Sequence, residues 1–328
     1  MELIRLETSV DSMGTTWSVV LYGDHRDRME EAVNTAFDEV HRLNNLLSIY
    51  RPASEWSEIN RLAGQRPVAV SPEVFELIAR CLRYNRRSQG TFDITVGPLI
   101  KTWGFFKGAG RLPGPDEVAA ALAKVGCRHL HLDQTGRAVR FDVEGMEINP
   151  GGIGKGYAVD RMVRILRQKG LDTALVMASS SSIYGMGAPP DEPRGWRIDV
   201  RNPTRPRQHS ATEVFLKDMS LSTSGGYAQT FRAEGRTFSH IMAPRTGCPA
   251  QEMLQVSVTA PCAIDSEAWT KPFFILGRAW AAKHKPKRLN AFFCEDGPEQ
   301  AWGWLEPPWS SDAEPKKTPV VPLEYSAS

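Results

Sequence analysis

The sequence lacks any apolar run of the roughly 20 residues that a membrane-spanning helix requires. It also shows no secretory leader, because the opening residues Met1–Arg5 are followed by no long apolar stretch. We therefore expect a chain without a membrane span that, as given, stays in the cytoplasm.

Other absences narrow the class of function. The net charge is only +2, from 40 basic and 38 acidic residues, so electrostatics gives no reason to expect a nucleic acid as a partner. The five cysteines show no C-x-x-C spacing, which argues against a zinc site and a disulfide framework. No strand-like run leads into G-x-G-x-x-G with an acid about 20 residues further on, which argues against a Rossmann dehydrogenase.

The sequence does contain a mixture of strand-like and helical patterns. Apolar residues recur every three or four positions over 28–47, and Ser71 followed by Pro72 marks the start of a second helix. Further helices are expected from about Asp116, over 155–169 and over 266–283, and strands over 13–22, 173–177, 196–201, 254–259 and 289–294. Because these elements follow no regular βαβ rhythm, we predict an α+β fold.

The composition also bounds the domain organisation. The chain has 328 residues, of which 41% are hydrophobic, and this is enough for a sizeable core. We expect a single domain over residues 1–305. The Pro- and Ser-rich stretch 306–328 is predicted to be a tail outside that core.

Two segments combine turn-forming residues with side chains that bear chemistry. In 239–247 (SHIMAPRTG), a Pro and a Gly three residues apart predict a tight bend that presents His240 and Arg245. In 149–160 (NPGGIGKGYAVD), a glycine-rich turn precedes a helix, whose free N–H groups and Lys155 would attract a pyrophosphate. The alternative for this second segment is a glycine turn that merely permits close packing.

Together with 90–99 (GTFDITVGPL) and 222–227 (STSGGY), these segments resemble the ApbE family of FAD:protein FMN transferases. The resemblance implies a T-fold-like architecture of mixed and antiparallel sheets packed with helices. It implies that FMN moves from FAD to a Thr or Ser hydroxyl of an acceptor flavoprotein, often in an electron-transfer chain, with release of AMP. Members of this family are often periplasmic or lipid-anchored.

The same resemblance implies which residues form the site. Those expected to bind FAD are Met13, Tyr50, Phe92, Asp93, Ile94, Asn149, Lys155 and Ile241. Tyr50 would stack on the isoalloxazine ring, and Asp93 would bond either to the ligand or to the local backbone. The catalytic candidates are Lys155, His240 as base or orienter of the hydroxyl, and Arg245, which would hold phosphate or brace the turn.

The family also implies a Mg²⁺ site, which would correspond to Gly152, Glu267 and Lys271. Here the sequence departs from the pattern, because Asn149 and Ala243 replace acids and Lys271 replaces a threonine. Mg²⁺ requires oxygen ligands and tolerates no ammonium among them. We therefore hypothesise that the Lys271 ammonium replaces the metal, pairing with Glu267 at i,i+4 and touching the pyrophosphate; the alternative is an exposed Glu-Lys pair.

Two other functions remain open at this point. The first is hydrolysis of the FAD pyrophosphate to FMN and AMP, with water in place of the acceptor. The second is a flavin-binding protein that has lost catalysis, which the altered metal positions would favour.

Overall fold

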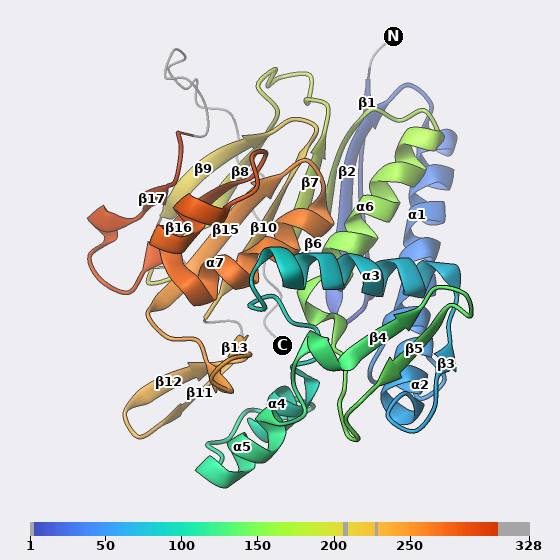
Figure 1. Cartoon of the computed structure of the whole chain (residues 1–328). Helices are drawn as coiled ribbons and strands as arrows, with labels where there is room; N and C mark the ends of the chain where they lie inside the picture. Colours follow the sequence, from blue (N-terminus) through green and yellow to red (C-terminus); the bar gives the residue numbers. More distant parts are fainter. Residues whose placement is uncertain (1–2, 206–208, 227–228, 308–328) are drawn as a thin grey trace.

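The computed structural model describes residues 3–205, 209–226 and 229–307, and its main feature is an eight-stranded sheet (Figure 1). Every pair of neighbouring strands in this sheet is antiparallel. In order across the sheet, the strands are β1 (Ile4–Ser12), β2 (Thr15–Gly23), β6 (Thr173–Ala178), β7 (Ser182–Met186), β10 (Met219–Gly225), β15 (Met253–Ala260), β16 (Asn290–Glu295) and β17 (Gly303–Trp304).

Strand β6 shows why this sheet is covered on both faces. Successive side chains of a strand point to opposite faces. Ala174, Val176 and Ala178 belong to the core under the helices, whereas Leu175 and Met177 pack into a second core on the other face. The strand is therefore apolar throughout, which matches the run that predicted it.

Helices cover one face of the sheet (Figure 1). They are α1 (Arg26–Leu47), α3 (Pro72–Arg87), α6 (Gly154–Gln168) and α7 (Ala263–His284). The predicted start of α3 is confirmed, with Pro72 in its first turn and the Ser71 hydroxyl accepting a hydrogen bond from the Val74 amide at 3.4 Å. Helix α7 is interrupted at Gly277, whose φ of 74° is not helical.

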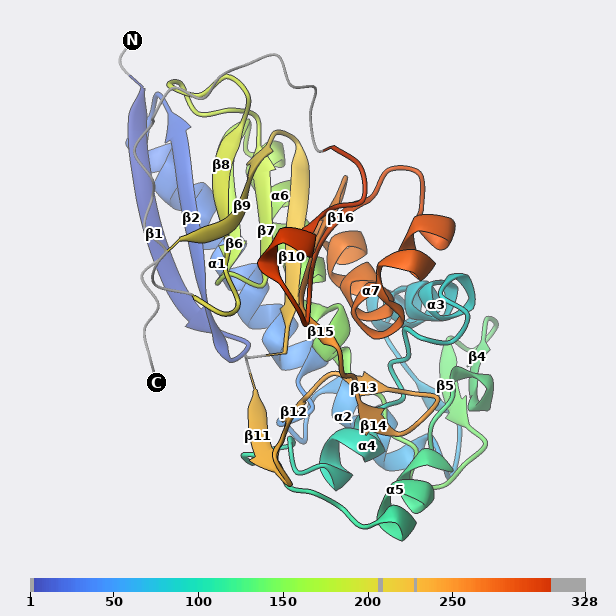
Figure 2. The same ribbon diagram turned by 90° about the vertical axis from the view of Figure 1, so that its left-hand side faces the viewer.

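A hairpin covers the opposite face of the sheet, as the turned view in Figure 2 shows. It consists of β8 (Trp196–Arg201) and β9 (Ser210–Leu216), and its apolar residues pack on the second core. The Trp196 indole donates to the Met186 carbonyl at 3.0 Å, which fixes the hairpin to β7.

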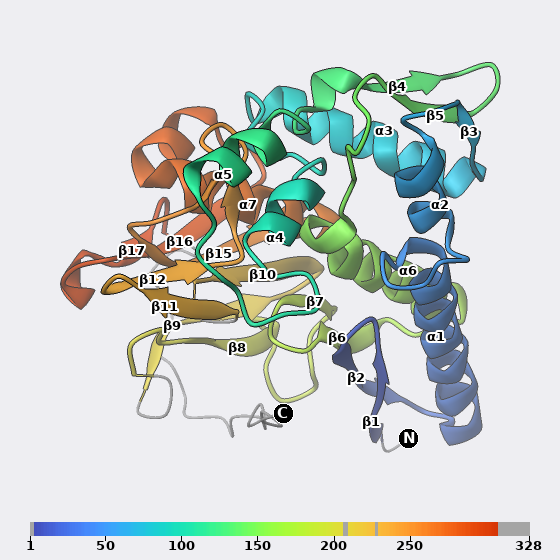
Figure 3. The ribbon, with the colours of Figure 1, turned by 90° about the horizontal axis from the view of Figure 1, so that it is seen from below.

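The remaining elements lie below the main sheet in Figure 1, and Figure 3 shows them from that side. A small sheet of β3 (Val68–Ala69), β5 (Ala138–Phe141) and β4 (Leu130–Asp133) lies near α2 (Glu55–Leu62). Trp103 and Phe105 pack with the hairpin of β11 (Thr230–Ala233) and β12 (Arg236–Ser239). Around them lie α4 (Gly97–Thr102), α5 (Pro115–Leu122), β13 (Met242–Ala243) and β14 (Cys248–Pro249).

Most predicted elements are present, but the first strand is placed differently. Met13 and Gly14, predicted to begin a strand, form instead the two-residue turn between β1 and β2, with φ values of 51° and 70°. Positive φ at both positions is typical of the tight hairpin turn. Strand β1 was not predicted. The tail predicted from Glu306 lies, beyond residue 307, outside the described residues.

Within the part of the chain that the structure describes, no helix is both long and apolar enough to cross a membrane.

Candidate active site

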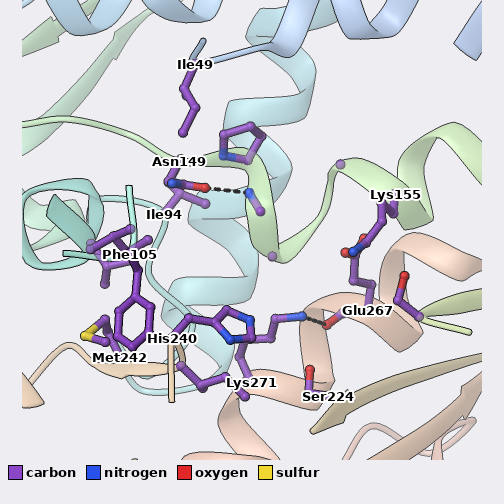
Figure 4. A pocket seen from close by; sticks show the side chains of 18 of the residues that line it. Ile49, Ile94, Phe105, Asn149, Lys155, Ser224, His240, Met242, Glu267 and Lys271 are labelled. Carbon is purple, nitrogen blue, oxygen red and sulfur yellow. Dashed lines mark hydrogen bonds between the residues drawn. The ribbon is translucent and has the colours of Figure 1, made fainter. Parts of the chain in front are cut away.

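A cavity of about 450 Å³ lies where the β1–β2 turn, the end of α1, the glycine turn, β10 and α7 meet. Twelve of the thirteen predicted site residues line it: Met13, Tyr50, Phe92, Asp93, Ile94, Asn149, Gly152, Lys155, His240, Ile241, Glu267 and Lys271. Segments far apart in the sequence therefore converge on one space, and Figure 4 shows Lys155, His240 and Lys271 around it.

The side chain of Asn149 closes the glycine turn, and the turn leads directly into α6. Asn149 Oδ1 accepts a hydrogen bond from the Gly151 amide at 2.7 Å and so caps the short 3₁₀ helix Pro150–Gly152. Helix α6 begins two residues later, with its N-terminus at the cavity. Its dipole and Lys155 favour an anion there. Among the described residues, the Lys155 ammonium has no hydrogen-bond or ion-pair partner.

Close contact between α6 and α7 fixes the position of the glycine turn. A Cβ added to Gly156 would lie 2.6 Å from the carbonyl carbon of Ala263 and 2.9 Å from Ile264 Cα, so only glycine fits. The Gly156 amide donates to Glu267 Oε2 at 2.6 Å. Asp160 accepts hydrogen bonds from the Ala263 and Ile264 amides, at 2.6 and 3.0 Å, and so caps α7. The two interpretations of this glycine-rich segment therefore do not exclude each other: it permits close packing on α7, and it also faces the cavity where an anion would bind.

Lys271 does not make the predicted ion pair with the Glu267 carboxylate. Its Nζ donates instead to the main-chain oxygen of Glu267 at 3.3 Å and to Thr270 Oγ1 at 3.1 Å. The carboxylate is turned toward the Gly156 amide. Burial lowers the pKa of Lys271 to about 8 against the attraction of Glu267, with a further lowering by Lys155. The ammonium form still prevails at neutral pH.

The donor set at this position does not fit the Mg²⁺ ion that the family implies. Mg²⁺ needs a near-octahedral shell of oxygen ligands. Two oxygens that α7 offers, the main-chain oxygen of Glu267 and Thr270 Oγ1, already accept hydrogen bonds from Lys271. One carboxylate oxygen of Glu267 accepts from the Gly156 amide, and Ala243 supplies no side-chain oxygen. Among the described residues, no group of three His, Cys, Asp or Glu side chains is placed to hold a metal.

His240 stands between β12 and β13 with an imidazole that is neutral at physiological pH. Its amide donates to the Gln229 carbonyl at 3.2 Å, and its ring lies edge-on to Phe105 with centroids 6.4 Å apart. Nδ1 is buried and has no hydrogen-bond partner among the described residues. Burial lowers the pKa of His240 from 6.5 to about 4, and the ammonium charges of Lys271 and Lys155 contribute. Such an imidazole is unprotonated at neutral pH, so a ring nitrogen can accept a hydrogen bond from a hydroxyl group.

We expect His240 in the ligand-free protein to titrate with a midpoint near 4, as measured by NMR of the imidazole C–H resonances. Because the folded-state pKa is depressed, the ring is neutral above this midpoint and becomes protonated only below it. The His240→Asn variant assigns the resonance by its loss. A midpoint at or above 6.5 would contradict the buried, electropositive surroundings described above.

Two predicted site residues, Arg245 and Asp93, make hydrogen bonds to the protein backbone. Arg245 does not line the cavity, and its guanidinium donates to the Gln89 carbonyl at 2.6 Å, so it braces the turn and its predicted contact with phosphate finds no support. The Asp93 carboxylate accepts from the Thr95 amide at 2.7 Å and from the Cys127 amide at 3.2 Å. This is the local capping that the sequence left open.

The side of the cavity that carries Phe105 and Met242 is apolar and lies away from Lys155 (Figure 4). Tyr50 lies at its rim, 54% exposed, with its ring stacked on Phe106 at a centroid distance of 5.1 Å. Several lining residues that the sequence did not single out are apolar: Ile49, Val96, Ile100, Phe105, Met242 and Ile275. No sequence signal separates such residues from ordinary core positions. Of the segment 222–227, Thr223, Ser224 and Gly225 line the cavity, and Tyr227 lies outside the described residues.

The chain resembles known proteins in sequence. A family model described as the ApbE family matches residues 13–293. The FAD:protein FMN transferase of Klebsiella pneumoniae (strain 342) is 30% identical over 272 residues, which cover 81% of this chain and 77% of that protein. The FAD:protein FMN transferase of Salmonella typhimurium is 30% identical over 274 residues, with coverage of 81% and 77%.

Solved structures resemble it in fold. The apo form of the Pseudomonas stutzeri flavinyl transferase ApbE matches with a TM-score of 0.80 and 27% identity, over 91% of this chain and 93% of that one. The ApbE protein of Thermotoga maritima matches with a TM-score of 0.82 and 24% identity, over 92% and 96%. The predicted α+β fold is therefore confirmed.

Proposed function

Since the chain belongs to the ApbE family, we propose that it is an FAD:protein FMN transferase that moves FMN from FAD to a Thr or Ser hydroxyl of an acceptor flavoprotein. One observation carries this proposal: Lys155, the glycine turn and His240, from distant parts of the sequence, line the same cavity. Anion-attracting groups and a neutral imidazole thus line a single cavity, where they would face the same bound molecule.

The two ends of the cavity suit the two parts of the flavin half of FAD. Its volume of about 450 Å³ is within the range typical of small-molecule sites. The apolar end, with Phe105 and Met242, would take the isoalloxazine ring, and Tyr50, which lies at the rim against Phe106, would contact that ring. The diphosphate would then lie at the start of α6 beside Lys155.

The reaction that we propose is a displacement at phosphorus. The acceptor hydroxyl oxygen forms a bond to the phosphorus of the FMN half, and the bond from that phosphorus to the oxygen of the AMP phosphate breaks. The hydroxyl proton passes to the neutral His240, and AMP leaves with the electron pair of the broken bond. The lysine charges and the α6 amides stabilise the negative charge on the phosphate oxygens.

Incubation of the purified protein with FAD and a flavoprotein domain that carries a Thr or Ser attachment site tests this function. Mass spectrometry of the acceptor and chromatography of the nucleotides are the two readouts. We expect a mass gain of one FMN less one water and an equal amount of AMP. Free FMN and AMP without acceptor modification would indicate a hydrolase, and bound FAD without AMP would indicate a binding protein.

A further inference from the structure

Two oxygens at the cavity end of α7, the main-chain oxygen of Glu267 and the Thr270 hydroxyl oxygen, already accept hydrogen bonds. Thr270 Oγ1 donates to the main-chain oxygen of Glu267 at 2.7 Å and accepts from Ser224 Oγ at 2.7 Å. Lys271 Nζ donates to the same Thr270 hydroxyl at 3.1 Å and to the same Glu267 oxygen at 3.3 Å. The ammonium thus contacts two oxygens that a small cation bound at this position would need as ligands.

The Glu267 carboxylate makes this a place for positive charge. Its side chain is buried, with the residue only 3% exposed, and one oxygen accepts from the Gly156 amide at 2.6 Å. A buried carboxylate needs a compensating charge or several hydrogen bonds. Lys271 lies one helical turn further along α7, where its Nζ donates to the main-chain oxygen of Glu267 at 3.3 Å.

One N–H of Lys271 remains available to a ligand. An ammonium has three N–H donors, and two of them face Thr270 and Glu267. The side chain reaches the glycine turn, because a Cβ built on Gly152 would lie 3.7 Å from Lys271 Cε. Lys271 and Lys155 line the same cavity, one from α7 and one from α6 (Figure 4).

We propose that the Lys271 ammonium is the resident cation of this site, and that the protein binds the diphosphate of FAD without a divalent metal. The inference rests on the proposed function for the identity of the ligand, and it deepens that function by naming the charge that replaces a metal. Lys155 and Lys271 then hold the diphosphate from two sides, and the main-chain oxygen of Glu267 and the Thr270 hydroxyl hold Lys271.

The binding of FAD to the purified full chain, measured by calorimetry in EDTA and again in excess MgCl₂, tests this proposal. We expect the Kd in the two buffers to agree within about twofold, because no site for the ion is left open. Tightening by Mg²⁺ of about tenfold or more, which corresponds to about 1.4 kcal/mol, would overturn the proposal.

Substitution of the lysine gives a second, independent readout. In EDTA we expect Lys271→Met, which keeps the length of the side chain and removes its charge, to weaken FAD binding by about tenfold or more. Lys271→Arg is expected to recover part of the loss. The matched control is Lys169→Met, which removes an exposed lysine paired with Glu31 at the far end of α6 and leaves the Kd unchanged. Wild-type affinity in Lys271→Met would overturn the proposal.

The outcomes separate this inference from the proposed function. A wild-type protein that binds FAD only with Mg²⁺ retains the function and overturns the role of Lys271. A wild-type protein that binds FAD in neither buffer overturns both. If Lys271→Met does not fold, the comparison of the two buffers for the wild type still decides the question.

Discussion

Replacing His240 with asparagine is expected to lower the rate of FMN transfer by about 10² to 10⁴-fold, the usual contribution of a positioned acid or base. The amide keeps a polar side chain of similar size but cannot accept the proton of the acceptor hydroxyl at neutral pH. Since His240 carries no charge in the free protein, the Kd for FAD is expected to change by less than about threefold. Single-turnover transfer and calorimetry measure the two quantities separately.

The matched control for this variant is His131→Asn. His131 lies on β4, away from the cavity, where its ring pairs with Asp142 at 2.5 Å on the surface. We expect this control to transfer FMN at the wild-type rate. A His240→Asn protein with the same transfer rate as the control would remove His240 from the chemistry.

Replacing Gly156 with alanine is expected to destabilise the protein by about 2 kcal/mol, the upper end of the usual cost of overpacking less the gain in helix propensity. The added Cβ would lie 2.6 Å from the Ala263 carbonyl carbon, and backbone at that distance cannot move as a side chain can. Overpacking of this kind costs about 1–3 kcal/mol and sometimes more. The higher helix propensity of alanine offsets about 1 kcal/mol of that cost. Urea unfolding measures the difference.

A neighbouring glycine in the same helical turn provides the control. A Cβ on Gly154 would meet only Met13 Cε at 3.7 Å and Pro150 Cβ at 3.8 Å, which are ordinary contact distances. We therefore expect the free energy of unfolding of Gly154→Ala to lie within about 0.5 kcal/mol of the wild-type value, or slightly above it. Equal stability of the Gly156 and Gly154 variants would contradict the close packing of α6 on α7.

Elements whose signals are local could be predicted from the sequence. The Ser71–Pro72 pair sets the start of α3, and the three- and four-residue spacing of apolar side chains predicts α1 over nearly its full length. The start of α6 after the glycine turn was also predicted to within one residue. In each case the residues that cause the structure are neighbours in the sequence.

Elements whose stability depends on distant partners could not be predicted in the same way. Strand β10 is rich in serine, and its buried hydroxyls are satisfied by hydroxyls on other elements: Ser222 Oγ lies 3.1 Å from Ser182 Oγ and 2.7 Å from Ser266 Oγ. The sequence of β10 alone does not predict that these hydroxyl groups will be its hydrogen-bond partners. Strand β1 likewise becomes evident only through its pairing with β2.

The site shows the same division. The glycine turn, His240 and Lys155 could be named from the sequence because their motifs are short and concentrated. The Glu267–Lys271 pair was predicted from i,i+4 spacing and was wrong, because the Gly156 amide on another helix takes the carboxylate. For Arg245 the sequence left two roles open, and the partner that indicates the bracing role, Gln89, is distant in the sequence.

A crystal structure of the protein with FAD, grown in EDTA, tests the central claim most directly. We expect the diphosphate at the start of α6, with oxygens about 3 Å from Lys155 Nζ and Lys271 Nζ. The imidazole of His240 is expected to face the phosphorus of the FMN half. A diphosphate bound away from the glycine turn, or an FMN phosphorus that His240 cannot reach, would contradict the account.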